Sequence, residues 1–528
     1  MHHNYIIIDS EPPSLTKFDA LTPLLSMHRE NDDIFNHILD LELFFDFTYQ
    51  FYINKGFYQY LFKKIITFIQ YIIIVTTLFF ICYKIDYSQT ISTNSLTTIY
   101  FKYTVYNSLY ILISTVAGLI YVNHTINSLR NMYIVKKFYN RLLNLYDEDL
   151  NNIKWSTIIE LIIKAQKKYK FYKIYPTLSN FQIVNHIMRL DNIIMALIHQ
   201  NLITTHIYIP FFRYNWPYLP KLYIMCINFC IIQSVFNEIK QSRLLDDNSC
   251  AIVQQIMIKK ILFCSIGILL FSPFIVIVLS MYFLFRYFED FRQNKQNIRF
   301  RRWSRYSTWL FRQHNEMYHL LHQRLSIAYI YSDSYLKSFT SGFAILFSRF
   351  IAFVCGTILA VLLSLSMIDE DFLHIHIYHD KTSIWFIGIC SIILAVCRTS
   401  IPDEYQVFIP EKFMNKIILY TRYIPDIWKN NFHTISVKND FALLFQHRIT
   451  YIIEELCSII LVPYLLYFNV QTEIPLIIDF LKNNLKKDTK FNLGYIYNSP
   501  VVTSISTMVS MQNLEKSFDT DMFHIFDK

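Results

Sequence analysis

Several long apolar stretches constrain this chain more than any other feature of its sequence. A helix needs about 20 predominantly apolar residues to cross the hydrocarbon core of a bilayer. Of the 528 residues, 53% are hydrophobic and 17% are charged, which is too apolar for an ordinary soluble domain. The sequence therefore predicts an all-α, polytopic membrane protein. The expected transmembrane helices span residues 65–83, 104–122, 343–368 and 383–396.

Basic residues around these stretches predict their orientation, since cytosolic loops collect Lys and Arg. Lysines precede the first stretch and follow the second, whereas the segment 88–98 between them carries no charge. Likewise, Lys337 precedes the third stretch and Arg398 follows the fourth, and the segment 369–382 between them holds four acidic residues. We therefore expect two helical hairpins with lumenal loops at 88–98 and 369–382, and both ends of the chain in the cytosol.

Two further apolar runs, 261–285 and 451–468, have basic residues at both ends. A segment that crossed the membrane once would not leave both ends among cytosolic charges. Pro273 and Pro463 lie near the middles of the two runs, and proline disfavours the interior of a helix. We therefore expect two re-entrant hairpins that enter from the cytosol and turn at these prolines. The alternative is a proline-kinked core helix in each place.

Polarity divides the chain into three regions. A cytosolic tail is expected at 1–40, a membrane core at 41–480 and a second cytosolic tail at 481–528. Within the core, residues 132–260 and 300–337 have mixed polarity with helical spacing, which predicts cytosolic helices packed under the membrane. The first tail lacks the continuous apolar region of a cleaved signal, so we expect the first membrane helix to direct insertion.

No motif in the sequence supports catalysis or a cofactor. The seven glycines include no phosphate-binding spacing, which argues against an ATP-driven pump. The nine cysteines include no C-x-x-C pair and are interpreted as buried thiols. We assign no catalytic residue, no metal and no cofactor. His374, His376 and His379 beside Asp380 could bind a metal in principle, but a polar loop is the simpler interpretation.

Two other local patterns are weaker indications of function. The trio His314, His319 and His322 is interpreted as exposed histidines on a helix. Tyr5 and Ile8 form a tyrosine-x-x-apolar string that adaptor proteins can read as a vesicle-sorting signal, although such strings are frequent by chance here.

Basic and aromatic residues alternate over residues 292–312. This pattern suits a lipid headgroup interface, in keeping with a net charge of +9. Single-stranded nucleic acid would suit it too, but the neighbouring apolar run favours lipid, and no nucleic-acid partner is expected.

Short motifs along residues 40–480 occur in the order found in one family. They include Leu43-Phe44-Phe45, Lys55-Gly56-Phe57, Phe138-Tyr139, Ile187-Met188-Arg189-Leu190-Asp191-Asn192, Asn315-Glu316, Arg324-Leu325, Asp369-Glu370-Asp371, Tyr423-Ile424-Pro425-Asp426-Ile427-Trp428 and Glu454-Glu455-Leu456. With these motifs in this order and the apolar stretches between them, the chain resembles the autophagy-related protein 9 family of lipid scramblases.

The resemblance implies a domain-swapped homotrimer with four spans and two half-inserted hairpins per subunit. It implies an energy-independent scramblase, not an enzyme, that redistributes phospholipids between leaflets as the autophagosome membrane grows. The implied locations are the preautophagosomal structure, Golgi- and endosome-derived vesicles and the endoplasmic reticulum. The implied partners are phospholipids, lipid-transfer proteins and other autophagy proteins.

The resemblance also points to residues along a lipid path. The family carries a basic-basic-acidic triplet at a lateral opening, which aligns with Arg292, Gln293 and Asn294, and only Arg292 keeps its charge. The family's vertical pore is lined from the fourth span, which points to Gly388 and to Ser391 about one turn away. The alternative role for Gly388 and Ser391 is helix packing, which small residues often serve in membranes.

Two other classes of function remain open at this level. One is a scaffold that recruits partners to vesicles without transport, and the other is a small-solute channel or receptor with a similar number of helices. Hydropathy does not separate them from a scramblase. A channel would pass ions across a vesicle membrane, whereas a scaffold would disturb neither ions nor lipids.

Overall fold

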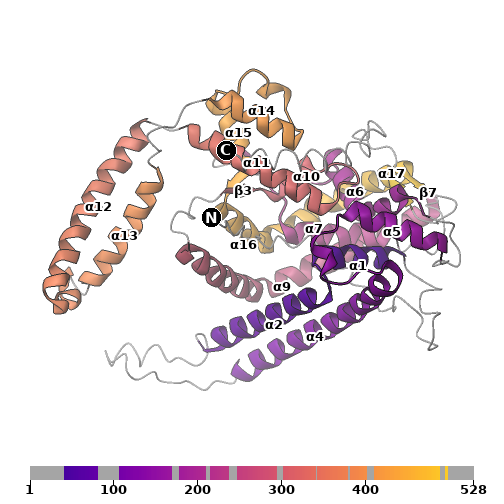
Figure 1. Ribbon diagram of the computed structural model, residues 1–528, viewed down its shortest axis with the longest axis horizontal. Helices are drawn as coiled ribbons and strands as arrows, with labels where there is room; N and C mark the ends of the chain where they lie inside the picture. The colour runs from indigo at the N-terminus through magenta and orange to yellow at the C-terminus, as the bar shows by residue number, and fades with distance from the viewer. Residues whose placement is uncertain are drawn as a thin grey trace.

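The computed structural model describes residues 41–80, 106–168, 178–209, 214–236, 247–293, 301–339, 342–378, 381–400, 409–487 and 494–496. The described chain is mostly helical, as the sequence predicted (Figure 1). The helices are α1 (Leu41–Ile53), α2 (Phe57–Phe79), α4 (Tyr106–Phe138), α5 (Trp155–Lys168), α6 (Asn180–His199), α7 (Lys221–Ile227), α9 (Asp247–Gln293), α10 (Arg305–Phe311), α11 (Tyr318–Ser338), α12 (Gly342–Ile368), α13 (Ser383–Ser400), α14 (Pro410–Thr421), α15 (Ile435–Leu444), α16 (Arg448–Leu465) and α17 (Gln471–Asn484).

The strands in the described residues are short and form two-stranded antiparallel pairs. These pairs are β1 (His206–Ile209) with β2 (Tyr214–Pro217), β3 (Arg301–Trp303) with β6 (Phe445–His447), β4 (His376–Tyr378) with β5 (Lys381–Thr382), and β7 (Leu485–Lys487) with β8 (Gly494–Ile496). The β3–β6 pair matters most for the fold, because it joins the segment before α10 to the segment before α16.

Helices α2 and α4, which overlap the first two expected spans, lie side by side (Figure 1). The hydroxyl of Tyr71 donates a 2.8 Å hydrogen bond to the Ser114 carbonyl, and the rings of Phe68 and Tyr121 stack with centroids 5.9 Å apart. The expected loop 88–98 lies outside the described residues. The two helices therefore pair as the hairpin prediction required.

Helices α12 and α13 form the second expected pair, joined by the short β4–β5 ribbon. They approach closely at Gly356, where an added Cβ would lie 3.3 Å from Leu394 Cδ1. Figure 1 shows this pair standing apart from the other helices. Large apolar side chains therefore remain exposed on it, such as Phe343 and Phe353.

Four helical segments in the described residues are long and apolar enough to cross a membrane, by length and composition. They are Phe57–Phe79, Cys250–Arg286, Ile345–Ile368 and Arg448–Asn484. The first and third overlap expected spans, whereas the other two contain the runs that were expected to be re-entrant. Helix α4 is not among the four, and the apolar part of α13 is shorter.

The expected hairpin turns at the two prolines are wrong, because the backbone stays helical through both. Pro273 lies inside α9, and Pro463 lies inside α16, which continues through a π-helical turn (Leu466–Val470) into α17. Proline leaves the carbonyl four residues earlier without its N–H donor. The Ser272 hydroxyl donates to that carbonyl, on Leu269, at 2.8 Å. This local hydrogen bond lets α9 continue past Pro273.

Three apolar clusters hold the remaining helices together. The first joins α1, α4, α5 and α6; the second joins α6, α7, α9, α16 and α17; the third joins α11, α14 and α15. Aromatic residues from the resemblance motifs supply much of this packing, including Phe44 against Phe138, with ring centroids 4.9 Å apart. Burial of each such side chain contributes roughly 1.5–3 kcal/mol. These clusters fix the helices that carry the polar residues described next.

Candidate functional site

A buried ion pair lies where the α10–α11 connection meets α14. Arg324 on α11 is 1% exposed, and its Nε and Nη2 atoms donate to the two carboxylate oxygens of Glu316, each at 2.8 Å. Arg324 also donates to the carbonyl of Phe311 at 2.8 Å and to the carbonyl of Tyr420. A two-pronged pair with its remaining donors satisfied compensates for the loss of hydration that burial causes. This pair therefore ties α10, α11 and α14 together.

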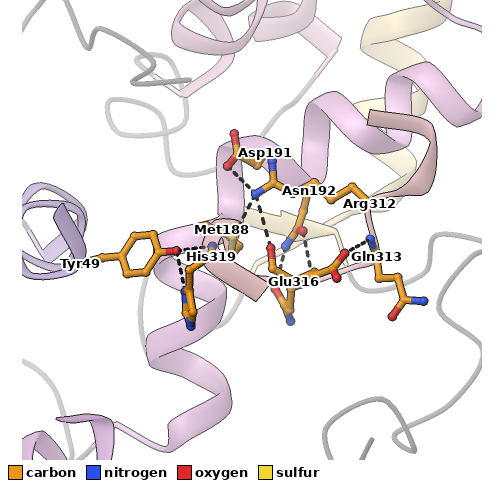
Figure 2. Close-up of polar contacts among 9 residues, drawn as sticks. Tyr49, Met188, Asp191, Asn192, Arg312, Gln313, Glu316 and His319 are labelled. Atoms are coloured by element: carbon orange, nitrogen blue, oxygen red, sulfur yellow. Dashed lines mark hydrogen bonds and ion pairs between the residues drawn. The ribbon is translucent and has the colours of Figure 1, made fainter. Parts of the chain in front are cut away.

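A second set of polar contacts connects this pair to α6 (Figure 2). Arg312 Nη2 donates to Asp191 Oδ2 at 2.9 Å, and both groups are largely buried. Asn192 donates its side-chain amide to Asn315 Oδ1 at 2.7 Å and accepts the Asn315 backbone N–H at 3.1 Å. The reciprocal bonds fix the turn at Asn315, whose positive φ of 58° is tolerated best by Asn and Gly. We call this set the central polar network.

The central polar network extends to α1 through Tyr49 and His319 (Figure 2). The Tyr49 hydroxyl accepts the backbone N–H of His319 at 3.2 Å and is also hydrogen bonded to His319 Nδ1 at 3.0 Å. Burial, and then the charge of Lys55, lower the pKa of His319 to about 4. Burial raises the pKa of Tyr49 well above its usual value. Both groups are therefore neutral at pH 7, and they position α1 against α11.

A third polar cluster anchors the first turns of α16. Glu454 accepts from Trp216 Nε1 at 2.5 Å and from Gln446 Nε2 at 2.9 Å. Glu455 accepts from Arg305 at 3.0 Å and from the backbone N–H of Lys221 at 3.3 Å. Carboxylates in an apolar helix are costly unless such partners satisfy them. The cluster therefore joins α16 to α7, α10 and the β1–β2 hairpin.

The hydrogen bonds of these networks are directed at one another and at backbone groups. Such an arrangement sets the relative positions of helices and does not poise a nucleophile beside a base. Among the described residues, no group of three His, Cys, Asp or Glu side chains is placed to hold a metal ion. The three polar clusters therefore fix the positions of α1, α6, α7, α10, α11, α14 and the first turns of α16 relative to one another.

The residues expected along a lipid path lie on two separate helices. Gly388 and Ser391 are exposed on α13, and no heavy atom lies within 4 Å of the position that a Cβ on Gly388 would take. Arg292 and Gln293 lie in the last turn of α9, and Asn294 lies outside the described residues, as do Tyr5 and Ile8. Figure 1 shows α9 and α13 apart, so one subunit does not bring the two sets together.

Part of the 292–312 stretch has a different role from the expected headgroup interface. Arg305 and Arg312 are used in the internal ion pairs described above, and Trp309 and Phe311 are buried. The histidine trio agrees with expectation only at His322, which is exposed on α11. His319 is hydrogen bonded to Tyr49 and is not exposed, and His314 precedes the helix.

Sequence reasoning singled out Asp191, Glu316, Arg324 and Glu455 within motifs but assigned them no role. A usable signal was present, because carboxylates next to apolar runs require cationic partners. The cationic partners themselves could not be identified from the sequence. Arg312, the partner of Asp191, and Arg305, the partner of Glu455, each lie more than 100 residues away along the chain.

A family model described as "Autophagy protein ATG9" matches residues 33–495 of the chain. Autophagy-related protein 9 of Vanderwaltozyma polyspora is 30% identical over 469 residues, which cover 85% of this chain and 48% of the relative. Autophagy-related protein 9 of Kluyveromyces lactis is 29% identical over 476 residues, which cover 87% of this chain and 52% of the relative. The chain thus spans about half the length of the curated relatives that it matches.

A solved structure has the same fold. The cryo-EM structure of Schizosaccharomyces pombe Atg9 is similar with a TM-score of 0.65 and 23% identity, over 88% of this chain and 99% of that chain. The family model covers most of the sequence, and it includes every residue of the three polar clusters. The chain therefore belongs to the autophagy protein ATG9 family.

Proposed function

We propose that the chain is an energy-independent phospholipid scramblase that moves lipids between the leaflets of vesicle and autophagosomal precursor membranes. The observation that carries the proposal is the surface of α13, an apolar helix on which Gly388 and Ser391 are exposed. The open space at Gly388 leaves room for a headgroup. A small, polar, hydrated surface lowers the barrier that a charged headgroup meets in hydrocarbon.

We further propose a homotrimer in which the α12–α13 pair packs against a neighbouring subunit. The support is the separation of this pair from the other helices of its own chain, together with its exposed phenylalanines. Three copies of α13 would then surround a central path. Mass measurement of the protein in nanodiscs tests this proposal, because a monomer or dimer that still scrambled lipid would remove the central path.

A lateral entrance for lipid is proposed near the end of α9, at Arg292, Gln293 and Asn294. Arg292 is the charged member of this set, and further basic residues follow it along the chain. A charge at a wet interface contributes only about 1 kcal/mol toward an anionic lipid. The charge at this entrance is therefore expected to have only a small effect on the entry of lipids.

The proposed location is the preautophagosomal structure, Golgi- and endosome-derived vesicles and the endoplasmic reticulum, with both ends of the chain in the cytosol. The proposed partners are phospholipids, lipid-transfer proteins that deliver lipid to one leaflet, and other autophagy proteins. A scramblase suits such a partner, because lipid delivered to one leaflet must be redistributed for a membrane to grow.

The direct test is lipid exchange in proteoliposomes that contain a fluorescent phospholipid. An impermeant quencher added outside removes only the outer-leaflet signal from protein-free vesicles. With the reconstituted protein, nearly all of the signal is expected to be lost, without ATP. If the inner-leaflet signal survived across several lipid compositions, the scramblase proposal would be wrong and a scaffold would remain. Ion flux measured in the same vesicles distinguishes a small-solute channel.

A further inference from the structure

Two ammonium groups and three aromatic rings form one array where α2 begins and α4 ends. Lys136 Nζ lies 4.0 Å from the ring centroid of Tyr58 and 5.4 Å from that of Phe57. The ring centroids of Phe57 and Tyr133 are 6.0 Å apart, and Lys137 Nζ lies 4.8 Å from the Tyr133 centroid. We call these five side chains the lysine–aromatic site.

The charges of the lysine–aromatic site are not neutralised by carboxylates. In the part of the chain that the structure describes, neither Lys136 nor Lys137 takes part in an ion pair. Asp147 approaches the same end of α2, but its Oδ2 accepts the backbone N–H of Phe57 at 3.2 Å. Aromatic faces attract an ammonium group without cancelling its charge. The site therefore presents two positive charges held in place by rings.

The site is accessible to a ligand. Tyr58 is 64% exposed and Tyr133 is 49% exposed, while both lysines are half-buried. The half-buried stems restrict the lysine side chains, so an anion that binds here meets ammonium groups that are already positioned.

The position of the site along α2 indicates a membrane lipid as its occupant. The apolar face of α2, a helix that is long enough to span a membrane, begins at the exposed Phe62 and continues through the exposed isoleucines at 65, 66 and 69. Tyr58 precedes Phe62 by four residues, which at 1.5 Å per residue is roughly 6 Å along the helix. The polar headgroup layer adds roughly 5–7 Å on each side of the hydrocarbon core. The lysine–aromatic site thus lies at headgroup depth, directly beside a lipid-facing surface.

We propose that the lysine–aromatic site binds the headgroup of an anionic glycerophospholipid whose acyl chains lie along α2. A zwitterionic choline headgroup fits less well, because the lysines already occupy ring faces that would otherwise hold the choline. A net anionic headgroup gains from both ammonium groups. This inference needs α2 to cross the membrane but does not require lipid transport.

The test is native mass spectrometry of the full chain in detergent, titrated with phosphatidylserine or with phosphatidylcholine of the same acyl chains. The wild-type protein is expected to bind phosphatidylserine in preference. Replacing both lysines with glutamine (Lys136→Gln with Lys137→Gln) keeps much of their length and removes both charges. Each lysine near an anionic lipid is expected to contribute roughly fivefold in affinity, so the double variant loses most of the preference.

Two further variants separate a specific site from general surface charge. Lys412→Gln with Lys416→Gln on α14 removes the same charge from exposed lysines outside the site, and the lipid preference should survive. Tyr58→Leu keeps every charge but removes a ring that positions Lys136, so it should weaken phosphatidylserine binding.

Three outcomes would overturn the proposal: no preference in the wild-type protein, equal losses in both double variants, or displacement of the lipid by inorganic phosphate. The last would indicate a site for soluble anions. Loss of lipid exchange in proteoliposomes with intact phosphatidylserine binding would count against the scramblase proposal alone. The two proposals can therefore fail separately.

Discussion

Arg324 and Glu316 lie eight residues apart in the chain and meet as a two-pronged ion pair with both N–O distances at 2.8 Å. Both side chains are almost completely buried. Because the guanidinium also donates to backbone carbonyls of α10 and α14, one side chain fixes three helices. Removing it affects more than a single contact.

Arg324→Met is expected to lower the free energy of unfolding by about 3–5 kcal/mol, because it leaves the Glu316 carboxylate buried without its cation. Unfolding of the detergent-solubilised protein, followed by circular dichroism, measures this change. Lys337→Met is the matched control, since its pair with Asp333 is on the surface and its loss should cost less than about 0.5 kcal/mol. Equal effects of the two substitutions would contradict a structural role for the buried pair.

Gly56→Ala is expected to destabilise the protein by about 1–3 kcal/mol. Gly56 has a φ of +114°, which residues with a Cβ rarely adopt, and an added Cβ would lie 2.7 Å from Asp147 Cγ. Gly267→Ala is the control: it lies inside α9 with no neighbour within 4 Å, so alanine should be neutral or slightly stabilising. Thermal unfolding of both variants makes the comparison, and a stable Gly56→Ala protein would refute the steric account.

Stability is expected to depend on pH through His319. Its pKa in the folded protein is lowered to about 4 by burial among Tyr49 and Tyr52 and by the charge of Lys55. Between pH 6.5 and 4, the imidazole of His319 binds a proton in the unfolded chain but not in the folded chain. The contribution of His319 to the free energy of unfolding is therefore complete above pH 6.5. As the pH falls toward 4, this free energy decreases by at most about 3 kcal/mol.

His319→Leu should flatten this part of the stability profile, whereas substitution of the exposed His433 to Leu should leave it unchanged. The measurement is the unfolding midpoint at several pH values. An unchanged slope in the His319 variant would assign the pH dependence to other groups.

In the proposed scramblase, Gly388→Trp is expected to slow lipid exchange several-fold and to leave the proposed trimer intact, because an indole fills space that a headgroup needs. Ile392→Trp on the same helix is the control, since it replaces one large exposed apolar residue with another. Arg292→Ala should have a weaker effect than Gly388→Trp, since it removes one screened charge at a wet entrance. Quencher assays compare the rates of lipid exchange of the three variants. A normal rate in the Gly388→Trp variant would support a packing role for Gly388.

The orientation of the membrane helices is expected to leave the α12–α13 loop in the lumen. Cys457 is exposed, contrary to the expectation of buried thiols, so it is first replaced with serine. One cysteine is then added at Glu370, Lys412 or Lys482, and the protein without the added cysteine gives the background labelling of the other native thiols. In sealed vesicles with the cytosolic face outward, an impermeant maleimide should modify positions 412 and 482 and should reach position 370 only after detergent. Labelling at 370 in intact vesicles would reverse the predicted orientation.

Local properties of the sequence determined the class of protein and the pairing of its hairpins. Apolar length is sufficient to indicate a membrane helix, because an unpaired backbone is too costly in lipid for any other local structure. The basic residues that flank these stretches predicted the pairing of α2 with α4 and of α12 with α13, which the structure shows. The expected turn at Pro273 was wrong, because the rule against proline in helices does not include a donor such as Ser272 at the freed carbonyl.

Tertiary structure alone decided how the polar residues are used. The basic and aromatic stretch around residues 292–312 has a composition that fits a lipid surface, yet Arg312 is paired inside the fold with Asp191, 121 residues away. Composition does not show which charged residues become buried. Their burial depends on how helices that are far apart in the sequence pack against one another. The sequence by itself therefore determined the helical membrane architecture, whereas the three-dimensional packing determined which charged residues hold it together and which remain available to lipid.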